Sequence, residues 1–243
     1  MKKRLLLVGE VTNKIEAFIE QVQGEGHEVI VASKVKYKKH MTIDLSNPKN
    51  IKSFVKAFNQ RYAYLDGLVF IDSMMTDDVS LTPQGYNPMM AYNFIGPLLL
   101  SEALKATLKT EEHARIIFLG SSTIFTENTI DLSSDLKGLN AYLSSKLSLL
   151  KYALYLSDEL KDDHVTVNML AENKEEQGFF KRLMKKHVID VDLNTLYDLL
   201  FSEAYRYKTG KFIEGHKILA LPQEKLNNKE VKDYIKGVLK EVK

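Results

Sequence analysis

Tyr142 and Lys146, four positions apart, are the residues of this 243-residue sequence whose types and spacing best support chemistry. On a helix, residues at i and i+4 share one face, so the ammonium group would lie beside the phenol. A neighbouring positive charge lowers the pKa of a phenol from its ordinary value of about 10, which lets the phenol act as a general acid or base. The same spacing is also typical of an exposed helical pair that has no function.

Two further polar residues could join this pair. Ser121 follows a buried run at 115–119, 21 positions before Tyr142 (142 minus 121), and Asn93 lies in a predicted helix. Ser122 is an alternative to Ser121, because sequence patterns place the end of an element only to within a few residues. The structural alternatives are a loop or capping serine and a buried amide that supports a bent helix.

The elements that must position these residues follow from the alternation of short apolar runs with longer amphipathic segments. This order predicts an α/β fold, a doubly wound parallel sheet of about seven strands in a single domain over residues 1–243. Strands are expected at 4–8, 27–32, 41–43, 67–71, 115–119, 164–170 and 211–218. Helices are expected at 47–61, 88–109 with a bend at Gly96-Pro97, 141–160, 193–204 and 228–243. In such sheets a ligand lies beyond the carboxyl ends of the strands.

Composition excludes several other classes of protein. Lys plus Arg (34) minus Asp plus Glu (32) gives a net charge of +2, which argues against nucleic acid as a partner. The six histidines lack metal-ligand spacing, so no metal site is predicted. No stretch approaches the ~18 to 20 apolar residues of a spanning helix, so no membrane partner is predicted. The absence of cysteine fits a reducing compartment, and we expect a cytoplasmic protein.

Five landmarks in chain order resemble the short-chain dehydrogenase/reductase family. They are Asn93-Phe94-Ile95-Gly96, Leu119-Gly120-Ser121, the segment from Ala141 through Tyr142 to Lys146, Val165-Thr166-Val167-Asn168, and the segment from Tyr207 to Lys211. The resemblance implies a nucleotide-binding fold that moves hydride between a nicotinamide cofactor and a small carbonyl or alcohol substrate.

The same resemblance assigns roles to the four polar residues. Tyr142 would protonate the carbonyl oxygen as hydride arrives, and Ser121 would hydrogen-bond the same oxygen. Lys146 would lower the pKa of Tyr142 and hydrogen-bond the nicotinamide ribose. Asn93 would position a water molecule that continues the proton relay to Lys146.

The phosphate-binding turn departs from the family pattern. The family has Thr-Gly-x-x-x-Gly-x-Gly after the first strand, whereas residues 8–15 read VGEVTNKI and keep only Gly9. Asn13 and Ile15 replace glycines that allow the backbone to approach a pyrophosphate. Glu10 adds a negative charge where a phosphate would bind.

Two other cofactor motifs also differ from the family. Asp72-Ser73 stands where the family has the end of an Asn-Asn-Ala-Gly sequence, and Glu172-Asn173 stands in place of Pro-Gly. The segment before the helix at 193–204, which forms the substrate lid in the family, is short.

Two residues remain as candidates for the adenosine half of the cofactor. Asp44 resembles an adenine-contacting aspartate, although an N-cap or turn residue explains it equally well. Lys34 follows the second strand, where an acidic residue would favour NAD(H), so NADP(H) is favoured over NAD(H). Three lysines and a histidine enlarge this basic patch, which is otherwise typical of a solvated loop: Lys36, Lys38, Lys39 and His40.

Two hypotheses follow for the whole protein. The first is an oxidoreductase with Tyr142 as general acid/base; the alternative is a non-catalytic member of the family that acts as a binding or scaffold protein. Under either hypothesis we expect a homo-oligomer, a dimer or tetramer paired through the helices that carry Asn93 and Tyr142. The apolar face would include Leu147, Leu150 and Leu154, although an intramolecular core explains the same stripe.

Overall fold

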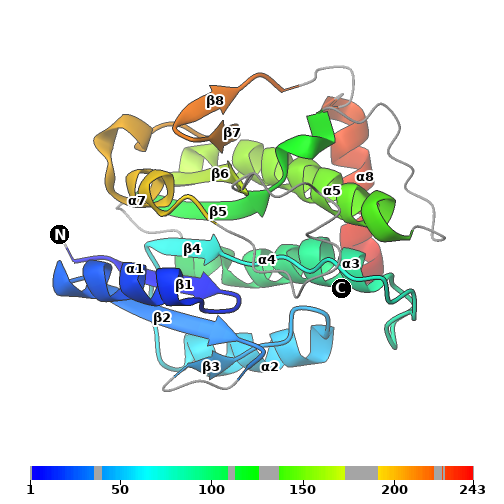
Figure 1. Cartoon of the computed structure of the whole chain (residues 1–243), viewed down its shortest axis with the longest axis horizontal. Coiled ribbons are helices and arrows are strands. Elements are labelled where there is room, and N and C mark those ends of the chain that lie inside the picture. The colour runs from blue at the N-terminus through cyan, green and yellow to red at the C-terminus, as the bar shows by residue number, and fades with distance from the viewer. Residues whose placement is uncertain are drawn as a thin grey trace.

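An eight-stranded sheet forms the centre of the computed structural model (Figure 1). The structure describes residues 2–35, 40–108, 113–125, 137–172, 191–221, 226 and 228–242. The strands lie in the order β3-β2-β1-β4-β5-β6-β7-β8. They are β1 Arg4–Val8, β2 Glu28–Ser33, β3 Met41–Thr42, β4 Gly67–Phe70, β5 Ala114–Gly120, β6 Val165–Ala171, β7 Lys211–Glu214 and β8 Lys217–Leu219. The predicted fold class is therefore confirmed, and the order reverses beside β1, where such sheets bind ligands.

The last predicted strand, 211–218, is wrong in one respect, because it is two strands. Strands β7 and β8 pair antiparallel, and all other neighbouring strands pair parallel. The chain reverses at Gly215 and His216, whose φ angles are 50° and 64°. Two successive positive φ angles are typical of the tight turn that joins hairpin strands, so the turn adds an eighth strand at the edge.

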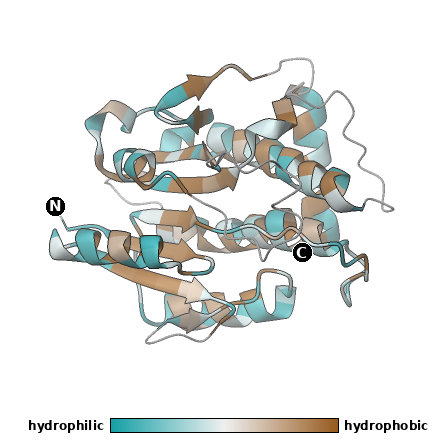
Figure 2. Cartoon of the chain, in the orientation of Figure 1, coloured by the Kyte–Doolittle hydropathy of each residue, from teal (hydrophilic) through white to brown (hydrophobic). Residues whose placement is uncertain are grey.

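Helices cover both faces of the sheet, as the alternation of elements predicts. Helices α1 (Asn13–Gly24) and α7 (Leu193–Phe201) pack on one face. On the other face lie α2 (Pro48–Asn59), α4 (Gly96–Leu108) and α5 (Gly138–Glu159). The central strands are therefore apolar on both sides, which is why they are mostly brown in Figure 2.

The helix that carries Asn93 is bent, but by a wider turn than the sequence predicts. Its first turn, α3 (Pro88–Met90), leads into a π-helical segment, η1 (Ala91–Ile95), and then into α4. The Gly96 amide bonds to the Ala91 carbonyl five residues back. Because Pro97 has no amide to return to the carbonyl of Asn93, one extra residue is accommodated just before it.

The C-terminal helix, α8 (Asn228–Val242), packs on this same chain. Ile235 is fully buried, and the Tyr234 ring stacks on Phe94 with centroids 6.1 Å apart. The Tyr234 hydroxyl also lies 3.0 Å from the Ser148 hydroxyl of α5. Helix α8 therefore covers part of the surface formed by η1 and α5.

The close approach of α4 to the segment after β3 requires a glycine at Gly96. A Cβ atom there would lie 2.2 Å from the Leu45 carbonyl oxygen, which belongs to the backbone and cannot rotate away. We expect Gly96→Ala to lower the melting temperature by about 6–12 °C, since overpacking of this kind costs about 3 kcal/mol. Gly24→Ala is the control, because that Cβ meets nothing within 4 Å and alanine favours the helix. Thermal unfolding followed by circular dichroism checks both variants, and equal melting temperatures would contradict the packing described.

Candidate active site

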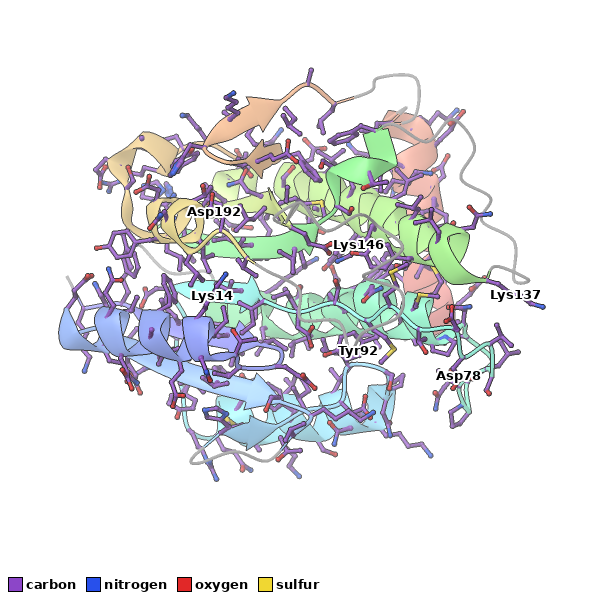
Figure 3. All side chains as sticks on the ribbon, viewed as in Figure 1. Lys14, Asp78, Tyr92, Lys137, Lys146 and Asp192 are labelled. Carbon is purple, nitrogen blue, oxygen red and sulfur yellow. The ribbon has the colours of Figure 1, made fainter. Side chains whose placement is uncertain are left out.

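A buried ion pair lies at the carboxyl end of the sheet. Lys146 of α5 is 1% exposed, and its ammonium group lies 3.0 Å from Oε1 of Glu172, the residue directly after β6. The same ammonium donates a hydrogen bond to the Leu119 carbonyl of β5, at 2.9 Å. Figure 3 places Lys146 beyond the arrowheads of the central strands. The pair thus joins α5 to the ends of β5 and β6.

The Glu172 carboxylate also accepts hydrogen bonds from two neutral hydroxyl groups. The Tyr142 hydroxyl donates a hydrogen bond to Oε1, and the Ser73 hydroxyl donates to the same atom at 2.9 Å. The Glu172 amide donates to the Gly120 carbonyl at 2.9 Å, which fixes the residue beside β5. An oxygen that accepts from an ammonium and two hydroxyl groups carries no proton itself, so all three donors converge on Oε1 as an acceptor.

Burial sets the electrostatics of Lys146. The pKa of Lys146 is lowered because burial removes its ammonium from water, and the Glu172 and Asp72 carboxylates offset part of that loss. The lysine therefore depends on its carboxylate partner to keep its charge.

Asn93 lies in η1 and connects α5 to the segment after β4. Its Oδ1 accepts from the Met74 amide at 2.7 Å, and its Nδ2 donates to the Met74 carbonyl at 2.8 Å and to the Ser145 hydroxyl at 3.0 Å. Both amide hydrogens are therefore used next to Lys146. The predicted role of Asn93 in a water relay stays a prediction.

The two candidate serines differ in their partners. The Ser122 hydroxyl donates to Glu214 of β7 at 2.6 Å, so it is already engaged. Ser121 is buried, and within the described part of the chain its hydroxyl makes no hydrogen bond. Ser121 directly follows Gly120, whose carbonyl accepts from the Glu172 amide, and of the two serines it is the one whose hydroxyl has no hydrogen-bond partner among the described residues.

The Asp72 side chain packs against Gly9 in the turn after β1. Gly9 has a φ of 141°, and a Cβ atom there would lie 2.4 Å from the Asp72 Cβ. The Asp72 carboxylate accepts from the Tyr92 hydroxyl at 2.8 Å and from the Glu10 amide at 3.4 Å. Gly9 thus makes room for Asp72, and the carboxylates of Asp72 and Glu10 both lie at this turn.

Ile15, which stands in place of a glycine of the family motif, points into the core at the start of α1. Ile15 is 4% exposed and packs with Phe18 and Ile19 against the sheet, so its side chain lies in the core and not above the turn. The Thr12 hydroxyl accepts from the Ile15 amide at 3.3 Å and caps the helix.

Lys34 and Asp44, predicted as separate cofactor residues, form an ion pair of 2.9 Å. The pKa of Asp44 is lowered: partial burial raises it, but hydrogen bonds from Ser46 and Lys34 outweigh that effect. The Lys34 side chain is 55% exposed, so an incoming anion could still reach it. Lys36, Lys38 and Lys39 of the predicted basic patch lie outside the described residues, as do most of the Ser121 to Tyr142 loop and the predicted lid at 173–190.

Neither a metal-ligand cluster nor a membrane-spanning helix is found among the described residues. Across the described ranges, no group of three or more metal-ligating side chains comes together. None of the described helices is long and apolar enough to cross a membrane.

Glu172, Ser73 and Asp72 are the site residues that the sequence patterns miss. They stand at positions where this chain departs from the family motifs. Ser73 donates to Glu172 at the site, and Asp72 accepts from Tyr92 and from the Glu10 amide. A usable signal is an acidic residue directly after a fully buried strand, since strand ends converge at the ligand-binding edge.

Comparison with known proteins gives a consistent picture. A family model described as short chain dehydrogenase matches residues 2–173. Polyprenol dehydrogenase of Danio rerio is 28% identical over 177 residues, which are 68% of this chain and 52% of that protein. Retinol dehydrogenase 13 of Mus musculus is 31% identical over 134 residues, which are 53% of this chain and 40% of that protein. The chain thus spans about half the length of the curated relatives it matches.

Solved structures share the fold. A 3-alpha-hydroxysteroid dehydrogenase from Pseudomonas sp. B-0831, complexed with NADH, has a TM-score of 0.68 at 18% identity over 87% of this chain and 94% of that one. An uncharacterized protein from Mycobacterium Paratuberculosis has a TM-score of 0.76 at 14% identity over 99% of this chain and 93% of that one. At these identities the likeness shows the architecture alone.

The Asp72 carboxylate should make stability depend on pH. Its pKa is raised, because burial outweighs the hydrogen bond from Tyr92. A raised folded-state pKa means that stability falls as pH rises from the unfolded value of 3.8 through the folded value. We expect Asp72→Asn to raise the melting temperature at pH 7 by about 2–4 °C, with the gain disappearing near pH 3. Exposed Asp77→Asn is the control; calorimetry that shows the same gain at both pH values would contradict this account.

Proposed function

Because the chain belongs to the short chain dehydrogenase family, we propose that it is an oxidoreductase that transfers hydride between a nicotinamide dinucleotide and a small carbonyl or alcohol substrate. The observation that carries the proposal is the convergence of Tyr142, Lys146 and Ser121 at the carboxyl end of β5. Tyr142 and Lys146 meet on Glu172, and Lys146 bonds the β5 backbone two residues before Ser121.

The residues present fit the nicotinamide half of the cofactor. Lys146 has three N–H donors, and within the described residues two of them are used, by Leu119 and Glu172, which leaves one for a ribose hydroxyl. When bound, the dinucleotide supplies or accepts the hydride. Ser121 then holds the substrate oxygen, and Tyr142 gives a proton to that oxygen or takes one from it.

The phosphate half fits less well. Asp72 and Glu10 place two carboxylates near the start of α1, where a helix N-terminus would otherwise attract a pyrophosphate. We therefore expect dinucleotide affinity in the micromolar range or weaker. NADP(H) is favoured over NAD(H), because the 2′-phosphate could compete with Asp44 for the exposed Lys34.

The relatives suggest a class of substrate. Those reported above are named for polyprenol and retinol, both of which are alcohols. We propose an alcohol, or the carbonyl compound formed from it, as the substrate.

A second candidate is the non-catalytic binding protein that the sequence also allows. It is favoured by Glu172, which already engages the Tyr142 proton and the Lys146 charge, and by the carboxylates at the phosphate turn. These contacts could also exclude a dinucleotide altogether.

Location and assembly remain proposals. A cytoplasmic location rests on composition alone. A dimer or tetramer rests on the family resemblance, and in this chain α8 packs on the surface formed by η1 and α5. Leu147 and Leu150 are already buried within the chain, so any self-association would use the surface that α8 leaves uncovered.

A calorimetric titration with NADPH and NADH separates the two functions. We expect saturable binding with NADPH preferred, and Lys34→Gln should weaken NADPH by about 5- to 10-fold, since one exposed charge pair is worth about 1 kcal/mol. NADH affinity should not change. Exposed Lys52→Gln on α2 is the control for a nonspecific loss of charge. If folded protein binds neither nucleotide at millimolar concentration, the non-catalytic function replaces the oxidoreductase.

A further inference from the structure

We propose that a second copy of this chain docks in a groove at the β2 edge of the sheet, so that two copies pair about a twofold axis. The groove has a volume of about 620 Å³, and α1 and β2, the blue elements at the left of Figure 1, form most of its lining. We refer to it as the β2 groove and define it by Ile19, Glu20, Val29, Val31, Arg61 and Tyr62. The inference concerns assembly and does not depend on the proposed oxidoreductase function.

A short connection explains why this groove exists. Strands β2 and β3 are parallel neighbours, but only residues 34–40, seven in number, join them. A parallel pair needs a crossover of about a dozen residues or more, which is usually a helix. The steps from β1 to β2 and from β2 to β3 run in the same direction across the sheet, so a right-handed crossover would place its helix beside α1. The link is too short for that helix, and the β2 groove lies in its place.

The floor of the β2 groove is apolar. Val31 of β2 is buried with Ile19 of α1 in one core, and Val29 packs against the same core while it stays partly exposed. Tyr62, after α2, is also partly exposed at the groove. An apolar centre within a polar rim is the usual anatomy of a protein interface, so the groove has the character of a docking surface.

Two tyrosines at the groove are held in place before a partner arrives. The Arg4 guanidinium lies over the rings of Tyr62 and Tyr64, 5.3 and 4.2 Å from their centroids. The same guanidinium donates to the Glu28 carboxylate of β2 at 2.8 Å. Tyr64 is nevertheless 44% exposed. Tyrosine and arginine are enriched at interfaces, and side chains that are already ordered lose less entropy on binding.

Two charges of opposite sign indicate that the partner is a second copy. Glu20 of α1 and Arg61 after α2 both line the groove and are exposed, and among the described residues neither side chain forms an ion pair. They come from helices on opposite faces of the sheet, so they lie on opposite sides of the groove. A basic or an acidic partner would pair with only one of them.

Twofold symmetry pairs both charges at once. In a twofold dimer the same surface of each copy meets its counterpart. An axis that runs along the groove turns the α1 side of one copy onto the Arg61 side of the other. Glu20 of each copy then faces Arg61 of the other copy, and this contact occurs twice in the dimer.

The β2 groove is separate from the helices that carry Asn93 and Tyr142, through which the family resemblance predicts pairing. Helix α8 packs on the surface formed by η1 and α5, and all three elements contribute to one core. Helix α1 packs in the other core, together with α7. The two modes of pairing therefore use different surfaces, which substitutions can distinguish.

Sedimentation velocity of the purified chain from about 1 to 100 µM tests the proposal. The samples are the wild type, Glu20→Arg, Arg61→Glu and an equimolar mixture of these two variants. Both positions are exposed, so the variants should fold, and thermal unfolding followed by circular dichroism checks this. Lys52→Glu of α2 and Asp77→Arg are the matched controls, because both residues are exposed and lie outside the groove.

We expect the wild type to dimerise with a Kd on the order of 10 µM, because one groove per copy gives an interface at the small end of the usual range. Each single variant should associate about tenfold more weakly or less, because two attractive contacts become repulsive. The mixture should return to within about threefold of the wild type, because each mixed dimer again brings opposite charges together at both contacts. The two controls should assemble as the wild type does.

Three results would overturn the proposal. A wild type that stays monomeric over the whole range shows that the groove takes a different partner or a small ligand. A dimer that neither charge reversal weakens uses another surface, such as the helices that carry Asn93 and Tyr142. A mixture as weak as the single variants shows that Glu20 and Arg61 do not face each other. None of these results bears on nucleotide binding, so the proposed function stands or falls separately.

Discussion

The site depends on a lysine ammonium buried in the centre of the molecule. Removing such a charge from water is costly, and the cost is met only by a partner charge and further hydrogen bonds. Lys146 finds a carboxylate in Glu172 and a backbone carbonyl in Leu119. Removing one partner of such a pair costs about 3–5 kcal/mol. The ends of β5 and β6 and the middle of α5 are therefore fixed relative to one another by one interaction.

The other polar groups of the site are arranged around this pair. Asn93 uses its whole amide to join the segment after β4 to α5, one residue before Lys146. Ser73, from that same segment, reaches Glu172. The result is a site whose hydrogen bonds are made within the chain, which holds Tyr142 in one orientation before any ligand arrives. Ser73 and Glu172, which stand where the family motifs have other residues, thus bond to each other, and Glu172 also bonds to Tyr142 and Lys146.

Much of the fold could be predicted from the sequence, because strands buried on both faces must be apolar throughout and their helices must be amphipathic. The split of the last strand was not predicted, because a positive φ is expected at glycine and is uncommon at a histidine such as His216. Tyr142, Lys146 and Ser121 could be predicted because their spacing is local or follows strand ends. The contact of Ser73 with Glu172 could not, because these residues lie 99 positions apart and meet only through the strand order. The Lys34 and Asp44 pair was missed although the residues are only ten positions apart, because they meet through the pairing of β2 with β3.

The central claim is that Oε1 of Glu172 accepts the Tyr142 proton beside the Lys146 ammonium. Neutron diffraction from crystals of the wild type grown with NADP⁺ tests it most directly, because it locates hydrogen atoms. The account predicts a proton on Tyr142 directed at Glu172 Oε1, three protons on Lys146 and none on Oε1 itself. A Glu172 side chain turned away from Tyr142, with the nucleotide in its place, would contradict it.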